Sequence, residues 1–239
     1  MAPAAEVFIQ ATGTDPDVQA RAVVEQAHER LLAGLAVLAQ PREEPEESEE
    51  STAEFVEQLR RLLTATDQTL YAAASGAAET RLLVRSLRVA AVTVARHADV
   101  LATAADSAER AARACTLEGM LTVRFGVERA VLLPALTALP GVDPAVLVGD
   151  FGTMLEGGRP AEQAVVDVRE IPHGRRHPRI FTRFARLAAG ESFVLVNNHD
   201  PKPLRREFQA THPGRFGWEY VESGPERWQI RITRTGDDA

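Results

Sequence analysis

The sequence predicts two structural classes in one chain, an N-terminal helical half followed by a smaller α+β half. Three observations predict this division. Apolar residues recur at helical spacing over the first two thirds of the 239 residues, and short apolar runs separated by proline and glycine follow. The charge also changes. Residues 163–239 hold 13 Arg+Lys and 10 Asp+Glu, a net charge of +3. Subtraction from the totals of 27 and 34 leaves 14 and 24 for residues 1–162, a net charge of −10, so the two parts differ in sign.

Four long helices are expected in the first half, and they cover residues 16–40, 52–74, 78–103 and 107–138. The acidic stretch of residues 41–50 contains two prolines and is expected to be a solvated linker. Pro140 ends the fourth helix, and a shorter helix runs from Asp143 to about Glu156. Because the later helices follow one another closely, residues 16–157 are predicted to form an antiparallel four-helix bundle.

The second half is predicted to cover residues 163–235, after a hinge at Gly157–Pro160. Its strands and helices should alternate as β-α-β-α-β-β, with strands at 165–168, 193–196, 216–222 and 227–233 and helices at 178–189 and 203–211. Pro178 is expected at the first position of the first of these helices, where a missing N–H costs nothing. This order predicts a two-layer sandwich with two helices on one face of a mixed sheet.

Residues 165–234 resemble the domain of unknown function 2249, a bacterial family whose fold is similar to the small TusA-like sulfur carriers. The resemblance rests on the segments Asn197–Leu204 and Phe216–Tyr220. It implies a Cys-Pro pair at the start of the first helix, in which the cysteine carries a persulfide. Here the pair reads His177–Pro178. Because an imidazole cannot form a persulfide, sulfur transfer is rejected for this chain.

Residues 16–157 resemble the hemerythrin-like (HHE cation-binding) family, a four-helix bundle that holds a di-iron centre. The resemblance rests on the segments Phe55–Leu59, Thr66–Tyr71 and Val131–Leu136. It implies His and Glu ligands four residues apart on inward faces of the helices. Most of those positions hold other residues in this chain, namely Leu62, Thr66, Ala91, Arg124 and Gly152.

Only His28 and Glu128 stay in ligand-like places. Two scattered ligands cannot hold two irons, whose affinity depends on several donors that converge at once. A bundle that has lost its metal centre is therefore expected. The four-residue spacing of Arg124 and Glu128 suggests a salt bridge that closes the same cavity.

A ligand site is predicted in the second half, at His177, Arg179, His199 and Asp200. The start of the first helix and the end of the second strand should face one crevice there, so that imidazole, guanidinium and helix N–H groups suit a small anionic ligand or a protein partner's carboxylate. Two alternatives remain open. His199 and Asp200 would form a turn while His177 caps a helix, or the imidazoles would bind a metal or a haem.

The favoured function is a non-enzymatic, cytoplasmic binding or regulatory protein without a cofactor, because no nucleophile–base set or nucleotide-binding motif is present. The net charge of −7 argues against nucleic acid, and no apolar run is long enough for a membrane span. The single cysteine, Cys115, is expected to be buried. The alternative is a redox or nitrogen-oxide-response metalloprotein that binds iron or haem, which iron and haem analysis would reveal.

Overall fold

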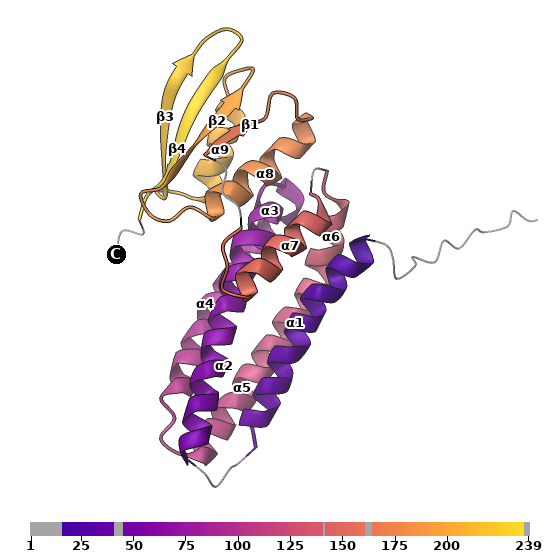
Figure 1. Ribbon diagram of the computed structural model, residues 1–239, viewed down its shortest axis with the longest axis vertical. Helices are drawn as coiled ribbons and strands as arrows, with labels where there is room; N and C mark the ends of the chain where they lie inside the picture. Colours follow the sequence, from indigo (N-terminus) through magenta and orange to yellow (C-terminus); the bar gives the residue numbers. More distant parts are fainter. Residues whose placement is uncertain (1–15, 41–44, 141, 161–163, 237–239) are drawn as a thin grey trace, which may run out of the picture.

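The N-terminal half consists of helices whose long axes run side by side (Figure 1). The computed structural model describes residues 16–40, 45–140, 142–160 and 164–236. In chain order the helices are α1 (Pro16–Leu38), α2 (Pro45–Thr66), α3 (Ala72–Ser75), α4 (Ala78–Ala102), α5 (Ser107–Val127), α6 (Leu133–Ala138) and α7 (Pro144–Leu155). Helix α1 packs against α2 and α5, α4 packs against the same two helices, and α7 packs against α1 and α2.

Two π-helical turns interrupt these rods. η1 (Asp67–Tyr71) joins α2 to α3, and η2 (Glu128–Leu132) joins α5 to α6. A π-turn adds a residue to a helical turn and so rotates the following side chains about the axis. Polar side chains lie in the interior at both turns, where Tyr71 and Glu128 are buried.

The linker predicted at residues 41–50 is wrong in its second part. Residues 41–44 lie outside the described residues, but α2 already begins at Pro45. Proline is tolerated in the first turn of a helix, where its missing N–H group would have no partner. The same acidic run that indicated a solvated linker is therefore compatible with a helix start.

Cys115 is a second correction, since it is exposed on the outer side of α5, two positions before the buried Leu117.

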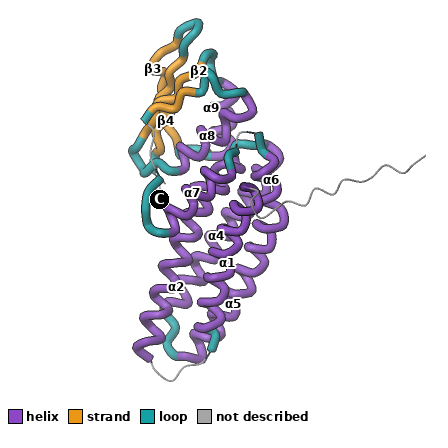
Figure 2. Tube along the Cα trace, turned by 45° about the vertical axis from the view of Figure 1, so that its right-hand side comes forward, coloured by secondary structure: helices purple, strands orange, loops and turns teal. Residues whose placement is uncertain are grey.

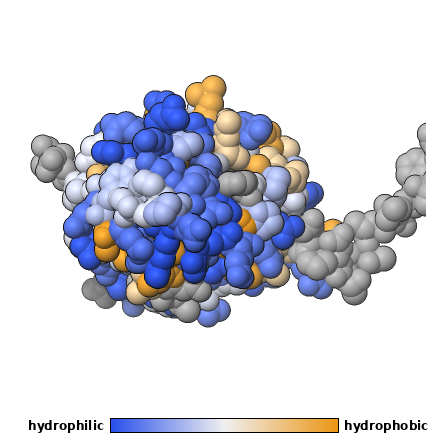
Figure 3. Space-filling model, turned by 90° about the horizontal axis from the view of Figure 1, so that it is seen from above, coloured by the Kyte–Doolittle hydropathy of each residue, from blue (hydrophilic) through white to orange (hydrophobic). Residues whose placement is uncertain are grey.

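The C-terminal half is a four-stranded sheet with two helices (Figure 2). Its elements are β1 (Val165–Asp167), α8 (His173–Ala185), β2 (Ser192–Asn197), α9 (Lys202–Thr211), β3 (Phe216–Ser223) and β4 (Trp228–Arg234). The strand order is β1-β2-β4-β3, with β1 and β2 parallel and the other pairs antiparallel. The predicted β-α-β-α-β-β order and mixed sheet are confirmed. Seen from this end of the molecule, the surface is mostly hydrophilic (Figure 3).

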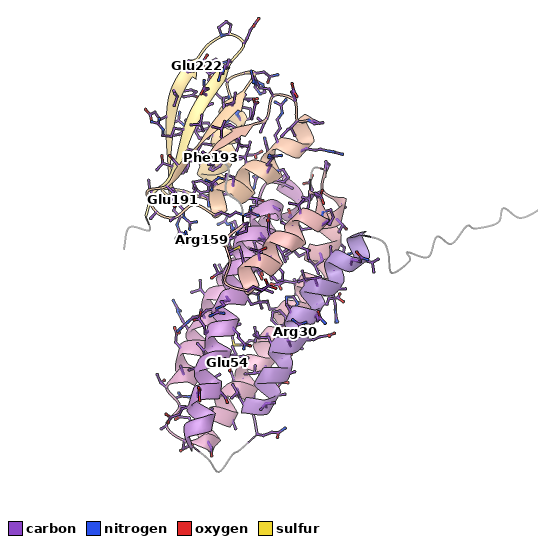
Figure 4. The ribbon with its side chains drawn as sticks, viewed as in Figure 1. Arg30, Glu54, Arg159, Glu191, Phe193 and Glu222 are labelled. Carbon is purple, nitrogen blue, oxygen red and sulfur yellow. The ribbon has the colours of Figure 1, made fainter. Side chains whose placement is uncertain are left out.

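Both helices of this half cover one face of the sheet. Phe193 lies opposite Ile232 and Leu195 opposite Ile230 in the β2–β4 register, and all four side chains are buried. Residues of α8 and α9 belong to the same apolar cluster, in which the rings of Phe181 and Phe208 stack at 4.6 Å between centroids. Figure 4 shows Phe193 between the sheet and α8.

Helix α8 begins five residues before its predicted start, so the placement of Pro178 at the first helical position is wrong. Pro178 lies inside the helix, which starts at His173. The buried Arg176 explains the earlier start, because its guanidinium donates to the carbonyl of Ile171 (2.6 Å) and to Asn197 Oδ1 (3.1 Å). These bonds hold the first helical turn in place. The first N–H groups of α8 are therefore those near His173, one turn before Pro178.

The two halves are packed together where α3 meets α8. A Cβ atom added at Gly76 would lie only 3.0 Å from the backbone nitrogen of Pro178, so the turn after α3 rests directly on the α8 backbone. An ion pair between Arg186 and Asp150 also joins them. The buried apolar side chains nevertheless form two separate clusters, one in each half. The division into domains at 16–157 and 163–235 stays a prediction.

Within the described part of the chain, no helix combines the length and the apolar character that crossing a membrane requires.

Candidate functional site

Two of the predicted site residues, His177 and Arg179, lie on α8 in different surroundings. His177 Nδ1 is 2.8 Å from Glu207 Oε2 on α9. The other carboxylate oxygen of Glu207 is 3.9 Å from the guanidinium of Arg81 on α4. Arg179 is exposed and lines a cleft between α7 and α8. The described contacts thus place His177 near the junction of the two halves and Arg179 at the cleft.

The other two predicted residues, His199 and Asp200, lie in the turn between β2 and α9. His199 Nδ1 is 2.8 Å from Asn198 Oδ1. The Tyr220 hydroxyl on β3 donates to Asp200 Oδ1 at 3.0 Å, and Lys202 Nζ is 3.2 Å from Asp200 Oδ2. These contacts hold the turn against β3. A single site that contains all four predicted residues stays a prediction.

A cleft lies between α7 and α8, and residues from both halves of the chain line it. It has a volume of about 470 Å³. The helical half contributes mostly apolar side chains and two carboxylates, from Ala73, Val142, Asp143, Val146, Leu147 and Asp150. The C-terminal half contributes three guanidinium groups and smaller side chains, from Val166, Pro178, Arg179, Thr182, Arg183 and Arg186. The cleft therefore has an apolar side and a basic side.

Two of the charged side chains that line the cleft, Arg186 and Asp143, are held by contacts with neighbouring groups. The Arg186 guanidinium pairs with Asp150 across the junction. The Asp143 carboxylate caps α7, where its Oδ1 accepts from the N–H groups of Ala145 (3.0 Å) and Val146 (3.3 Å). Guanidinium groups bind carboxylate and phosphate oxygens well, so the side of the cleft that carries Arg179, Arg183 and Arg186 suits an anion.

Three residues of this cleft were missed by the sequence interpretation: Arg183, Arg186 and Asp150. A signal for the arginines exists, because Arg179, Arg183 and Arg186 recur at the spacing of one helix face. The Arg183 guanidinium also lies over the ring of Phe193, 5.8 Å from its centroid. Asp150 offers no local signal, since its partner Arg186 is 36 positions away in the chain.

A second group of polar side chains is fully inside the helical half. We call it the buried quartet, and it consists of His28, Tyr71, Arg124 and Glu128. Arg124 Nε donates to Glu128 Oε1 at 2.8 Å, and Arg124 Nη2 donates to the Tyr71 hydroxyl at 3.0 Å. Tyr71 in turn donates to Glu128 Oε1. His28 Nε2 lies 3.2 Å from Glu128 Oε2. The contact between Arg124 and Glu128 that was predicted from their spacing is confirmed.

The quartet keeps Glu128 ionised and Tyr71 neutral. Burial alone pushes the pKa of Glu128 up, but the close contact with His28 and the charge of Arg124 outweigh it, so the net shift is downward. Burial and the neighbouring Glu128 carboxylate raise the pKa of Tyr71, and the hydroxyl stays a donor. His28 is further fixed by stacking on Phe125, with ring centroids 3.8 Å apart.

These residues do not fit a di-iron centre. Glu128 is bound by a guanidinium and a phenol, and the position four residues before it is the cation Arg124 in place of a metal ligand. Leu62 and Ala91 supply no donor atoms. Among the residues that the structure describes, no group of three or more His, Cys, Asp or Glu side chains is placed to hold a metal ion.

The comparisons with known proteins concern the C-terminal half. Residues 165–234 match the family model described as an uncharacterized conserved protein, DUF2249. This match confirms the predicted relationship of that half, from β1 to β4. No curated protein and no solved structure matches the chain.

Proposed function

We propose that this protein is a non-enzymatic binding protein and that the cleft between α7 and α8 holds its ligand, a small anion with an apolar part. The observation that carries this proposal is the presence of three guanidinium groups on one side of a cleft whose other side is apolar. A ligand there contacts both halves of the chain at once. Its binding therefore stabilises their packing, which suits a regulatory role.

The charged group of the ligand would lie beside Arg179 and Arg183. Guanidinium groups bind carboxylate and phosphate oxygens through paired hydrogen bonds, and such bonds are stronger than neutral ones. Arg186 already pairs with Asp150 and serves to hold α7 against α8. The hydroxyl of Thr182, one position before Arg183, adds a neutral donor and acceptor to the same side.

The apolar group of the ligand would lie against Val142, Val146, Leu147 and Val166. Pockets for small molecules usually have volumes of about 300–1,000 Å³, and the cleft falls within this range at about 470 Å³. A bare inorganic anion would leave the apolar side in water. A medium-chain or aromatic carboxylate uses both sides and is therefore the favoured class.

We also propose a fold family for each half of the chain. The helical half would be a hemerythrin-like antiparallel four-helix bundle that has lost its metal centre, and the ring of contacts among α1, α2, α4 and α5 supports it. The C-terminal half would share the TusA-like fold without its sulfur chemistry, because His177 stands at the cysteine position. We propose a cytoplasmic location and no cofactor for the whole protein.

Isothermal titration calorimetry with octanoate, benzoate and inorganic phosphate tests this function. For octanoate we expect a Kd on the order of 0.1–1 mM. Arg183→Gln should weaken binding about tenfold, since it removes a charge-assisted contact. Arg205→Gln is the matched control, because Arg205 is exposed on α9 and does not line the cleft. Equal effects of both substitutions, or no binding of any probe, would contradict the proposal.

A further inference from the structure

We propose that the ligand of the cleft is a free α-amino acid with an apolar side chain, and that Asp143 binds its ammonium group. This inference rests on the proposed function, because it keeps the carboxylate beside Arg179 and Arg183 and the apolar group on the opposite side. It adds a third recognised group. The cleft thus distinguishes an amino acid from a plain carboxylic acid with the same carbon skeleton.

The two helices that form the cleft, α7 and α8, lie side by side and run in the same direction (Figure 1). A Cβ atom added at Gly174, in the first turn of α8, would lie 3.3 Å from the Cβ atom of Pro140, shortly before α7 begins. The starts of both helices are therefore neighbours. Near their C-terminal ends, Arg186 of α8 pairs with Asp150 of α7.

Asp143 and Arg179 share the end of the cleft where both helices start. Each lies about two helical turns, or about 10 Å, before its helix reaches the Arg186–Asp150 pair. Both side chains line the cleft and are exposed. A head group that carries one negative and one positive charge therefore meets an opposite charge from each helix.

The Asp143 carboxylate keeps an oxygen for a ligand. The two hydrogen bonds with which it caps α7, from the N–H groups of Ala145 and Val146, both end on Oδ1. Its Oδ2 takes part in neither of them. The other carboxylate of the cleft, Asp150, is paired with Arg186. The ammonium group of a ligand is therefore expected at Asp143.

The side chain of the amino acid would lie along α7, toward the middle of the cleft. Val146 and Leu147 follow Asp143 by one helical turn on the same face of α7, and they line the cleft together with Val166. Leu147 and Val166 are buried, whereas Val146 is 59 % exposed. An apolar group placed here removes the Val146 side chain from water, which favours binding.

Isothermal titration calorimetry of the full chain with three related compounds tests this inference. L-Leucine carries all three groups, 4-methylpentanoate lacks the ammonium group, and 3-methylbutylamine lacks the carboxylate. We expect L-leucine to bind about threefold to fivefold more tightly than 4-methylpentanoate, which is the gain expected from an exposed ion pair. The amine should bind more weakly than either carboxylate.

Asp143→Asn should lower the affinity for L-leucine to that for 4-methylpentanoate, without weakening the binding of 4-methylpentanoate. Asparagine also caps helices, so the start of α7 is kept. Asp106→Asn is the matched control, because Asp106 caps α5 through the N–H group of Glu109 and does not line the cleft. It should change neither affinity.

The possible results separate the role of Asp143 from the proposed function. If 4-methylpentanoate binds as tightly as L-leucine, or if Asp143→Asn weakens both equally, the role of Asp143 is wrong and the site for an apolar carboxylate stands. If neither carboxylate binds, or if 3-methylbutylamine binds as tightly as L-leucine, the proposed function fails as well. The comparison of the three compounds needs no variant, so it stays decisive if Asp143→Asn does not fold.

Discussion

Tyr71 and Glu128 are 57 positions apart in the chain, yet the Tyr71 hydroxyl donates a hydrogen bond to the Glu128 carboxylate inside the helical half. Tyr71 is the last residue of η1, and Glu128 is the first residue of η2. A donor from one π-turn and an acceptor from the other thus meet in the interior. This contact joins the α2–α3 rod to the α5–α6 rod.

Tyr71→Phe should lower the free energy of unfolding by about 1–3 kcal/mol, because it removes a donor from a buried carboxylate and leaves the ring in place. Urea denaturation followed by circular dichroism measures this change. Tyr220→Phe is the control, since its hydroxyl donates to Asp200 in partly exposed surroundings and should matter less. If both substitutions cost the same, the buried quartet has no special weight in stability.

Stability should fall between pH 6.5 and 4 because of His212. Burial and the nearby charge of Arg88 lower the pKa of His212 from 6.5 to about 4. The unfolded chain binds a proton below pH 6.5, whereas the folded chain resists it until about pH 4. The contribution is therefore complete above pH 6.5 and is lost as the pH falls, by up to roughly 3 kcal/mol.

His212→Phe removes the titrating group and keeps an aromatic ring beside Phe181 and Phe184. Denaturation curves of this variant should lose most of the slope between pH 6.5 and 4. The loss of stability below about pH 4.5 should remain. The pKa of Glu128 is lowered in the folded state, so the stability that Glu128 contributes at higher pH is lost as the pH falls below this value. A slope unchanged by His212→Phe would show that other groups set the acid sensitivity.

Gly76→Ala should weaken the packing of the two halves, because the new Cβ would lie 3.0 Å from Pro178 N and 3.1 Å from the His177 carbonyl carbon. Both neighbours are backbone atoms, so the cost is expected to be about 1–3 kcal/mol. Gly119→Ala is a matched substitution on α5 where the Cβ meets nothing, and it should raise stability by about 1 kcal/mol. Calorimetric unfolding of both variants measures the difference, and a stabilising Gly76→Ala would contradict the packing described for α3 and α8.

Purified protein should contain neither iron nor haem, and chelators should leave its Tm unchanged, because the buried quartet already compensates Glu128 without a metal. Elemental analysis and the visible spectrum test this expectation. Two irons per chain, with the absorption of an oxo-bridged pair, would instead support the metalloprotein alternative.

The sequence is most informative about features set by neighbouring residues. The order of elements in residues 165–234 follows from short apolar runs and their breakers, and the contact between Arg124 and Glu128 follows from a four-residue spacing. The part that Tyr71 takes in the same quartet does not follow, because its partners Glu128 and Arg124 are 57 and 53 positions away in the chain.

Features that depend on distant residues are not readable from local pattern. The start of α8 at His173 depends on the hydrogen bonds of Arg176 to Ile171 and Asn197. Pro178 alone therefore predicted the wrong helix start. The cleft lies where α7 meets α8, and its Asp150–Arg186 pair joins two residues that no shared motif connects. Arginines on a helix surface are usually solvated, and what distinguishes these is the apolar side of the cleft opposite them.

The most direct test of the proposed function is methyl NMR of the full chain during titration with octanoate. We predict that the resonances of Val146 and Leu147 from the helical half and of Val166 from the C-terminal half shift together, with one common Kd, and that Arg183→Gln weakens all three shifts. Shifts confined to Val94 and Met120 in the groove between α4 and α5, or the absence of any shift at the cleft, would contradict it.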